Sequence, residues 1–209
     1  MAQNLFIWVA HPKAGSFCQA LADAYAAGAK TSGIAVKMME LSAMAFSSDT
    51  LPVKHQEQAD LEEDLKLFQD NILWADHILI VHPYWWGGIP ARTKAVIDRT
   101  FLPGFAYKYH ARGMGWDKLL TGHTADVIIT SDTPTWIDTI IYRAPTRRIW
   151  KNQILGFCGI KPRQIKQFGS VKLSDEKKRH KWLQKATFMG QSLGRFLGQD
   201  KSQASGDVS

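Results

Sequence analysis

The residues best suited to binding a ligand lie in a short aromatic segment, PYWWGGIP, which runs from Pro83 to Pro90. Glycine and proline place this segment in a surface loop, whereas large aromatic side chains normally lie in a core. Tyr84, Trp85 and Trp86 are therefore either buried beneath another part of the protein or form the wall of a pocket for a flat ligand. The composition of the loop leaves both alternatives open.

A second segment, HPKAGSFC, begins at His11 and carries groups that bind phosphate. His11, Lys13 and Ser16 supply a ring nitrogen, an amine and a hydroxyl. Ser16 is also placed to cap a helix, and the free N–H groups at a helix N-terminus favour an anion. We therefore predict a phosphate site here, with the alternative that His11 only helps to cap the helix.

A third segment, SDTPTW at 131–136, offers hydroxyls, the Asp132 carboxylate and the Trp136 indole. In the aromatic loop, Gly87 and Gly88 leave backbone N–H groups accessible. A phosphate site at one end and a flat aromatic surface at the other describe a flavin nucleotide. The chain has neither GxGxxG after its first apolar run nor GxxxxGK[ST] anywhere, which disfavours a dinucleotide Rossmann site and a P-loop.

The elements that must position these segments are strands and helices in alternation. Short apolar runs predict strands at 5–10, 34–41, 77–82, 126–130 and 164–168. Amphipathic patterns and caps predict helices at 16–31, 56–75, 91–101, 147–158 and 174–197, with irregular segments at 42–55 and 103–116. Such alternation is typical of an α/β domain with a parallel sheet. Ligands of these sheets bind at the carboxyl ends of the strands, where all three segments lie.

The composition fits one globular domain. Of the 209 residues, 45% are hydrophobic and 22% charged, and we expect a single domain over 1–198 and a disordered tail at 199–209. The N-terminus has no signal peptide or membrane span, so a cytoplasmic location is expected. Cys18 and Cys158 have no metal-binding spacing and are predicted to be buried. The net charge of +7 favours phosphate-bearing ligands, and no nucleic-acid-binding motif accompanies it.

The segments HPKAGSFCQALADA, ADHILIVHPYWWGGIPARTKAVIDRTF and GFAYKY resemble the flavodoxin-like NAD(P)H:quinone oxidoreductase family. The second is the most specific, because it joins a Trp, two Pro and a Lys at fixed spacing before a helix. The match is good from residue 5 to about 130 and continues mainly in the order of the elements. The resemblance implies a flavodoxin-like three-layer sandwich with a five-stranded parallel sheet of order 2-1-3-4-5, and a homodimer with each flavin at the interface.

The resemblance also implies roles for individual residues. The flavin phosphate loop corresponds to His11, Ser16, Phe17 and Cys18. The loop along the isoalloxazine ring corresponds to Pro83, Tyr84, Trp85, Trp86 and Gly87, and the loop against its pyrimidine edge to Thr130, Ser131, Asp132 and Thr133. Phe105 and Tyr107 are expected in the substrate pocket, near the dimer-related active site.

Two positions depart from the family pattern. Cys18 stands where the family usually has Asn, which removes an amide donor near the phosphate. The SDTPTW segment replaces a Gly-rich loop that accompanies a catalytic Tyr and His in quinone reductases. Asp132 and Trp136 are therefore the candidates for a catalytic role in place of that pair.

The implied activity is a hydride relay from NADH or NADPH through FMN or FAD to a quinone or similar small acceptor, with no metal. The alternative is a flavin-binding ancillary subunit of a potassium efflux system with little turnover. An electron-transfer flavodoxin fits less well, since those proteins tend to be acidic and this chain is basic.

Overall fold

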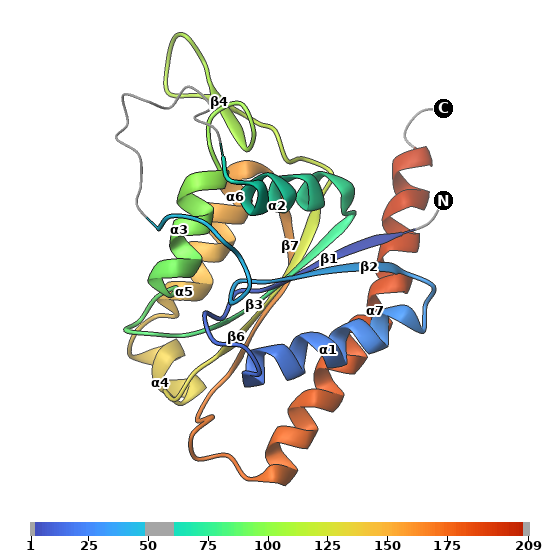
Figure 1. Ribbon diagram of the computed structural model, residues 1–209. Helices are drawn as coiled ribbons and strands as arrows, with labels where there is room; N and C mark the ends of the chain where they lie inside the picture. The colour runs from blue at the N-terminus through green and yellow to red at the C-terminus, as the bar shows by residue number, and fades with distance from the viewer. Residues whose placement is uncertain (1–2, 49–60, 207–209) are drawn as a thin grey trace.

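A computed structural model describes residues 3–48 and 61–206, which form three layers, with a parallel sheet between two layers of helices (Figure 1). The strands of this sheet are β1 (Asn4–Val9), β2 (Ala35–Glu40), β3 (His77–Pro83), β6 (Thr124–Thr130) and β7 (Lys161–Phe168). They lie in the order β2-β1-β3-β6-β7, all parallel. Numbered within the sheet alone, this is 2-1-3-4-5, so the predicted flavodoxin-like topology is confirmed.

The helices divide between the two faces of the sheet. One face is covered by α1 (Phe17–Lys30) and α7 (Glu176–Gly206), and the other by α2 (Glu63–Trp74), α3 (Ala91–Thr100) and the run α5 (Pro145–Arg148), η2 (Ile149–Leu155) and α6 (Gly156–Cys158). The short helix α4 (Thr135–Ile140) follows β6. A two-stranded hairpin of β4 (Tyr107–Tyr109) and β5 (Trp116–Lys118) projects at the top of Figure 1.

The central strands are apolar because both of their faces are covered. Every residue of β3 and of β6 is buried. In a strand, successive side chains point to opposite faces, so each strand contributes to two cores. Phe6 and Ile78 belong to the core under α2 and α3, whereas Ile7 and Leu79 belong to the core under α1 and α7.

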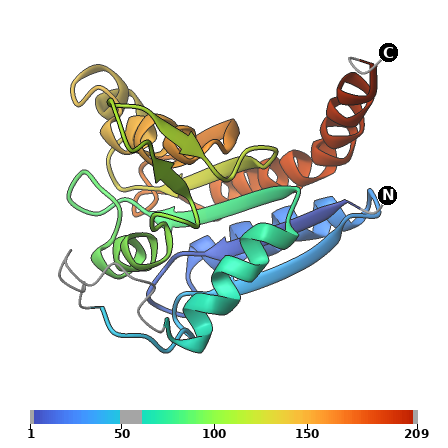
Figure 2. The same cartoon turned by 90° about the horizontal axis from the view of Figure 1, so that it is seen from above.

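Most predicted bounds agree with the structure to within a few residues. Ser16 caps α1 as predicted, since its Oγ accepts a hydrogen bond from the Gln19 N–H at 3.4 Å. The predicted helix at 56–75 begins outside the described residues, and its described part is α2. The structure differs at the C-terminus, where α7 continues to Gly206 and so extends into the segment predicted to be a disordered tail. Figure 2 shows this long helix ending on the same side of the molecule as the N-terminus.

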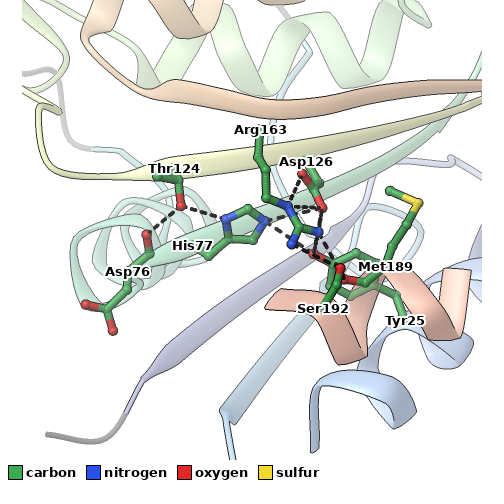
Figure 3. A network of polar contacts seen from close by, with 8 residues as sticks. All are labelled: Tyr25, Asp76, His77, Thr124, Asp126, Arg163, Met189 and Ser192. Carbon is green, nitrogen blue, oxygen red and sulfur yellow. Dashed lines mark hydrogen bonds and ion pairs between the residues drawn. The ribbon is translucent and has the colours of Figure 1, made fainter. Parts of the chain in front are cut away.

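A network of buried polar side chains lies near the amino ends of the strands, opposite the loops of the predicted site (Figure 3). The Asp126 carboxylate accepts hydrogen bonds from the Arg163 guanidinium and from the Tyr25 hydroxyl, the latter at 2.8 Å. His77 Nε2 lies 3.6 Å from the same carboxylate, and its Nδ1 lies 2.6 Å from the Thr124 hydroxyl. Burial alone would raise the pKa of Asp126, but hydrogen bonds and charges of His77 and Arg163 outweigh it and lower the pKa to about 2.

Arg163 also ties the C-terminal helix to the sheet. Its Nη2 donates to the backbone oxygen of Met189 at 3.0 Å, and its guanidinium lies 5.5 Å from the centre of the Phe196 ring. The backbones of α1 and α7 approach each other closely here. A Cβ atom on Gly190 would lie only 2.1 Å from the backbone oxygen of Tyr25. The network thus holds α1, three strands and α7 in one arrangement.

Candidate functional site

Two pockets lie at the carboxyl ends of the strands, where the sequence places the site. The smaller pocket has a volume of about 190 Å³ and is lined by His11, Phe17, Cys18, Pro83, Tyr84, Trp85, Thr130, Ser131, Asp132 and Val171. The larger pocket has a volume of about 570 Å³ and is lined by Tyr84, Trp86, Gly87, Asp132, Thr133, Tyr142 and Pro145. Tyr84 and Asp132 line both, so the pockets adjoin and bring the three predicted segments together.

The smaller pocket is bordered by the N-terminal turn of α1, which includes Phe17 and Cys18. Backbone N–H groups in this position favour an anion. His11 Nδ1 accepts a hydrogen bond from the Lys13 N–H at 3.0 Å, so the neutral ring carries its hydrogen on Nε2. Burial lowers the pKa of His11, which favours this neutral form. The pocket therefore combines a helix N-terminus with a ring N–H donor.

Cys18 lies on the floor of the smaller pocket and is buried. Its Sγ lies 3.3 Å from the Thr130 hydroxyl, so the first and third segments are joined at this point. Burial raises the pKa of the Cys18 thiol to about 12, which keeps the sulfur protonated at neutral pH. A thiol is a weak hydrogen-bond donor, and the site thus lacks the stronger amide donor of the family pattern.

The aromatic segment forms a tight turn. Trp85 and Gly88 exchange both backbone hydrogen bonds, at 3.2 and 2.9 Å, and the two residues between them have φ angles of 50° at Trp86 and 78° at Gly87. Residue Trp85 is about half exposed and residue Trp86 is fully exposed. Neither indole therefore lies in the core of this chain, and their contact with a flat ligand stays a prediction. Trp85 lines the smaller pocket and Trp86 the larger one.

Two contacts hold the loops around the pockets. The Thr146 hydroxyl, from α5, donates to the Gly87 oxygen at 2.9 Å and fixes the aromatic turn against this helix. Asp132 Oδ1 accepts from the Lys172 N–H at 2.7 Å. The third segment is therefore tied to the loop that precedes α7, with the rest of the Asp132 side chain bordering both pockets.

A buried group that sequence reasoning missed lies behind the pockets on α4. Asp138 is 1% exposed, and its Oδ2 accepts a hydrogen bond from Arg147 Nη2 at 3.0 Å. Its charge acts on Tyr84, the residue shared by both pockets. The available signal was Pro134 followed by an acid in the next turn, which is a helix-start pattern.

Six residues that the sequence placed in the site line neither pocket; among them, Lys13 is exposed, and the Gly88 N–H, expected to be accessible, donates to the Trp85 oxygen instead. Ser16 caps α1, and Trp136 lies exposed on α4. Phe105 and Tyr107, expected in the substrate pocket, pack instead against the core beneath α2 and α3. Their predicted roles in an assembled site stay predictions. Within residues 3–48 and 61–206, no group of three or more His, Cys, Asp or Glu side chains is arranged to hold a metal ion.

A buried chain of hydrogen bonds supports the start of the aromatic loop. Trp150, in the π-helical η2, donates from Nε1 to His82 Nε2 at 2.7 Å. His82 Nδ1 in turn lies 2.8 Å from the Pro83 oxygen, to which it donates. Burial lowers the pKa of His82 to about 4, so the ring is neutral and can accept from Trp150. This chain positions Pro83, which lines the smaller pocket.

Acid should destabilise the protein through His82. The unfolded state binds a proton at a pKa of about 6.5, whereas the folded state resists protonation down to about pH 4, so stability falls as pH decreases between these values. Across this pH range, the protonation of His82 should lower the free energy of unfolding by about 3 kcal/mol in total. Urea unfolding at pH 7, 6, 5 and 4 measures it. His82→Gln, which can accept from Trp150 without titrating, should flatten the pH dependence, and an unchanged slope in this variant would refute the assignment to His82.

Comparison with known proteins agrees with this geometry. A family model described as a flavodoxin-like fold matches residues 3–187. An uncharacterized NAD(P)H oxidoreductase from Haemophilus influenzae is 30% identical over 186 residues, which cover 84% of this chain and 88% of that protein. An FMN-dependent NADH:quinone oxidoreductase from Ruegeria pomeroyi is 32% identical over 138 residues, which cover 59% of this chain and 67% of that protein.

A solved structure shows the same arrangement. The crystal structure of Smu.1420 from Streptococcus mutans has a TM-score of 0.80 and 27% identity, over 91% of this chain and 100% of that one. In the part of the chain that our structure describes, no helix is both long and apolar enough to span a membrane.

The chain therefore belongs to the flavodoxin-like fold family and, within it, to the NAD(P)H oxidoreductases that its motifs predict.

Proposed function

We propose that the protein is an FMN-dependent oxidoreductase that passes electrons from NADH or NADPH to a quinone or similar small acceptor. The observation that carries this proposal is the pair of adjoining pockets, of which the smaller suits a phosphate and the larger can take a planar ring. The name of the Ruegeria pomeroyi relative supports FMN and a quinone. A cytoplasmic location is part of the same proposal.

The residues present fit such a cofactor. His11 Nε2 and the first turn of α1 would hold the phosphate, while the turn at Trp85–Gly88 and the loop from Thr130 to Thr133 would hold the ring. The ring, when bound, supplies the hydride chemistry. Asp132, which borders both pockets, is the candidate to contact the reacting molecules.

The overall reaction balances without a side-chain nucleophile. NADH or NADPH loses a hydride, which is one proton with two electrons. The quinone gains this hydride and one further proton from water, and becomes the hydroquinone. The chain's contribution is to hold donor and acceptor in turn against the same planar surface, since proximity and orientation remove much of the barrier. The N–H groups of Tyr84, Trp85, Gly88 and Ser131 already donate to backbone oxygens, so the remaining N–H groups of the two loops would stabilise negative charge that develops on the ring.

A homodimer is part of this proposal, because two residues that line the larger pocket, Trp86 and Tyr142, and three residues that shortly precede Tyr142 in the sequence expose large apolar side chains. The exposed ones are Trp86, Trp136, Ile140, Ile141 and Tyr142. Monomeric proteins rarely expose large contiguous apolar patches. A second copy of this chain would cover these side chains and enclose the pocket. Light scattering coupled to gel filtration should give twice the chain mass of 23.5 kDa, and a monomer at micromolar concentration would contradict the dimer.

Steady-state oxidation of NADH and NADPH with menadione tests the activity. We expect turnover that requires added or copurified flavin and saturates with both substrates. Tight flavin binding with negligible turnover for every nucleotide and acceptor pair would instead fit a regulatory flavin-binding subunit. Failure to bind flavin would contradict both.

Cys18→Asn should tighten FMN binding. An amide at this position adds a donor for the phosphate and can keep a hydrogen bond to Thr130, and one such bond contributes about 1 kcal/mol, or about a fivefold lower Kd. Quenching of FMN fluorescence on titration with flavin-free protein measures the Kd. Cys158→Ser, at a buried cysteine that lines neither pocket, is the matched control. A weaker affinity in Cys18→Asn would show that the phosphate is held elsewhere.

A further inference from the structure

Asp138 and Arg147 form an ion pair close to the pockets, and one oxygen of the Asp138 carboxylate has no hydrogen-bond partner among the described residues. Asp138 is 1% exposed, and its Oδ2 binds Arg147 Nη2 at 3.0 Å. Its Oδ1 is buried and has no hydrogen-bond partner among the described residues. Arg147 is 24% exposed and also donates to the Thr139 hydroxyl at 2.6 Å. The negative charge on Oδ1 is therefore only partly compensated, in a place where water does not screen it.

Tyr84 connects this ion pair to the pockets. Tyr84 lines both of them. The ion pair lies beside the larger pocket, because Tyr142 and Pro145, which stand between Asp138 and Arg147 in the sequence, line that pocket, and the Thr146 hydroxyl donates to the Gly87 oxygen at 2.9 Å. Burial, and after it the neighbouring Asp138 carboxylate, raise the pKa of Tyr84 to about 12, while Arg147 acts in the opposite direction. The hydroxyl is thus protonated at neutral pH. A molecule that occupies the pocket against Tyr84 experiences the same two charges.

The backbone that presents the pair is conformationally strained. Arg143 and Ala144, between α4 and α5, both have positive φ angles, of 57° and 51°. Such angles are sterically unfavourable for residues other than glycine. The Ala144 N–H donates to the backbone oxygen of Asp138 at 2.7 Å, so the strained turn folds α5 back against α4 and brings Arg147 to Asp138. Strain of this kind is concentrated at functional sites.

We propose that Asp138 and Arg147, acting through Tyr84, set how readily the ring bound in the larger pocket accepts electrons. Two-electron reduction of a flavin with uptake of one proton leaves one negative charge on the ring. The Asp138 carboxylate opposes this charge and Arg147 favours it. The unpaired Asp138 Oδ1 also attracts the hydrogen of the Tyr84 hydroxyl without forming a hydrogen bond, so that Tyr84 turns its lone pairs rather than its hydrogen toward the ring. This inference rests on the proposed function, since it requires a bound flavin.

The two charges predict shifts of opposite sign. Asp138→Asn removes the negative charge and releases the Tyr84 hydrogen to the ring, so the reduction potential of the bound flavin should rise. Arg147→Gln leaves Asp138 uncompensated, so the potential should fall. For each variant we expect about a tenfold change in the equilibrium constant of reduction, which for a two-electron couple is about 30 mV. Arg147→Lys keeps the charge and should restore most of the wild-type potential.

Potentials of the flavin-loaded protein are measured by equilibration with a reference dye under reducing conditions, so that the readout does not depend on turnover. Flavin stoichiometry and the melting temperature establish that each variant is folded and loaded. Glu63→Gln, which removes an exposed ion pair with Lys66 on α2, is the matched control for loss of one carboxylate. Shifts of the same sign in the Asp138 and Arg147 variants, or shifts no larger than that of the control, would overturn the inference.

A double-mutant cycle with Tyr84→Phe separates the two effects of Asp138. In the Tyr84→Phe background, Asp138→Asn should raise the potential by less, because no hydroxyl hydrogen is released and only the charge is lost. An equal shift in both backgrounds would contradict the part assigned to Tyr84. A wild-type protein that binds no flavin would overturn the proposed function, whereas a loaded protein whose potential is indifferent to these residues would overturn this inference alone.

Discussion

Arg163→Met should lower the free energy of unfolding by about 3–5 kcal/mol, because it leaves the Asp126 charge buried without its cation. The Asp126 side chain has no exposure to water, and the Arg163 side chain is 8% exposed. Tyr25 and His77 would remain as its partners, but neither carries a permanent positive charge. The variant would also lose the hydrogen bond from Arg163 to the Met189 oxygen, which anchors α7. Urea unfolding at pH 7 measures the change.

Two further variants make this prediction specific. Arg163→Lys keeps the positive charge but cannot reproduce the forked hydrogen bonds. Its free energy of unfolding should therefore lie between those of the wild type and Arg163→Met. Lys94→Met removes the cation of the exposed pair with Asp98 on α3, and its loss should stay below about 1 kcal/mol. If Arg163→Met were no more destabilising than Lys94→Met, the network would not be the anchor that we describe.

Trp86→Gly should have opposite effects on stability and on flavin affinity. Trp86 has a φ angle of 50° and a fully exposed side chain, so glycine relieves backbone strain without removing core packing. Glycine also has greater conformational freedom in the unfolded state, which offsets part of this effect. We therefore expect the free energy of unfolding to rise by about 0.5 kcal/mol. Loss of the indole from the larger pocket should weaken FMN binding about fivefold to tenfold, the usual contribution of an aromatic pair.

Trp86→Phe is the control for this trade-off, because it retains both an aromatic ring and the strained backbone. Its stability and its Kd for FMN should stay near the wild-type values. Thermal unfolding of flavin-free protein and FMN titration provide the two measurements. A Trp86→Gly variant that bound FMN as tightly as the wild type would show that this indole does not contact the ring.

The strands and the loops between them could be predicted because their signals are local. The buried run from His77 to Pro83 is continuously apolar in its centre, and Gly and Pro residues mark its end. The rule that ligands bind at the carboxyl ends of parallel strands then located the site without knowledge of any contact. The structure brings residues of 11–18, 83–87 and 130–133 together around two pockets, as that rule predicts.

The elements that were missed are too short for a periodic signal. Helix α4 has six residues and the strands β4 and β5 have three each, whereas hydrophobic periodicity needs a window of about 11. Asp138 was missed for this reason, since its burial depends on the turn at Arg143–Ala144 and on Arg147 beyond it. The predicted helix at 147–158 is interrupted by the π-helical segment η2, whose widened turn places Trp150 against His82.

The buried network could not be read from the sequence either. The network joins residues that lie far apart along the chain, namely Tyr25, His77, Asp126 and Arg163. The register of β3, β6 and β7 brings His77, Asp126 and Arg163 together, and the packing of α1 on the sheet adds Tyr25. Pairing of this kind is a property of the tertiary structure.

The central claim is that the pockets beneath the aromatic turn hold a flavin. The most direct test is the absorption spectrum of the purified full-length chain before and after addition of FMN and FAD, followed by mass determination of the released cofactor. We predict a yellow protein that retains one FMN per chain and quenches its fluorescence. A colourless protein that takes up neither FMN nor FAD would contradict the account.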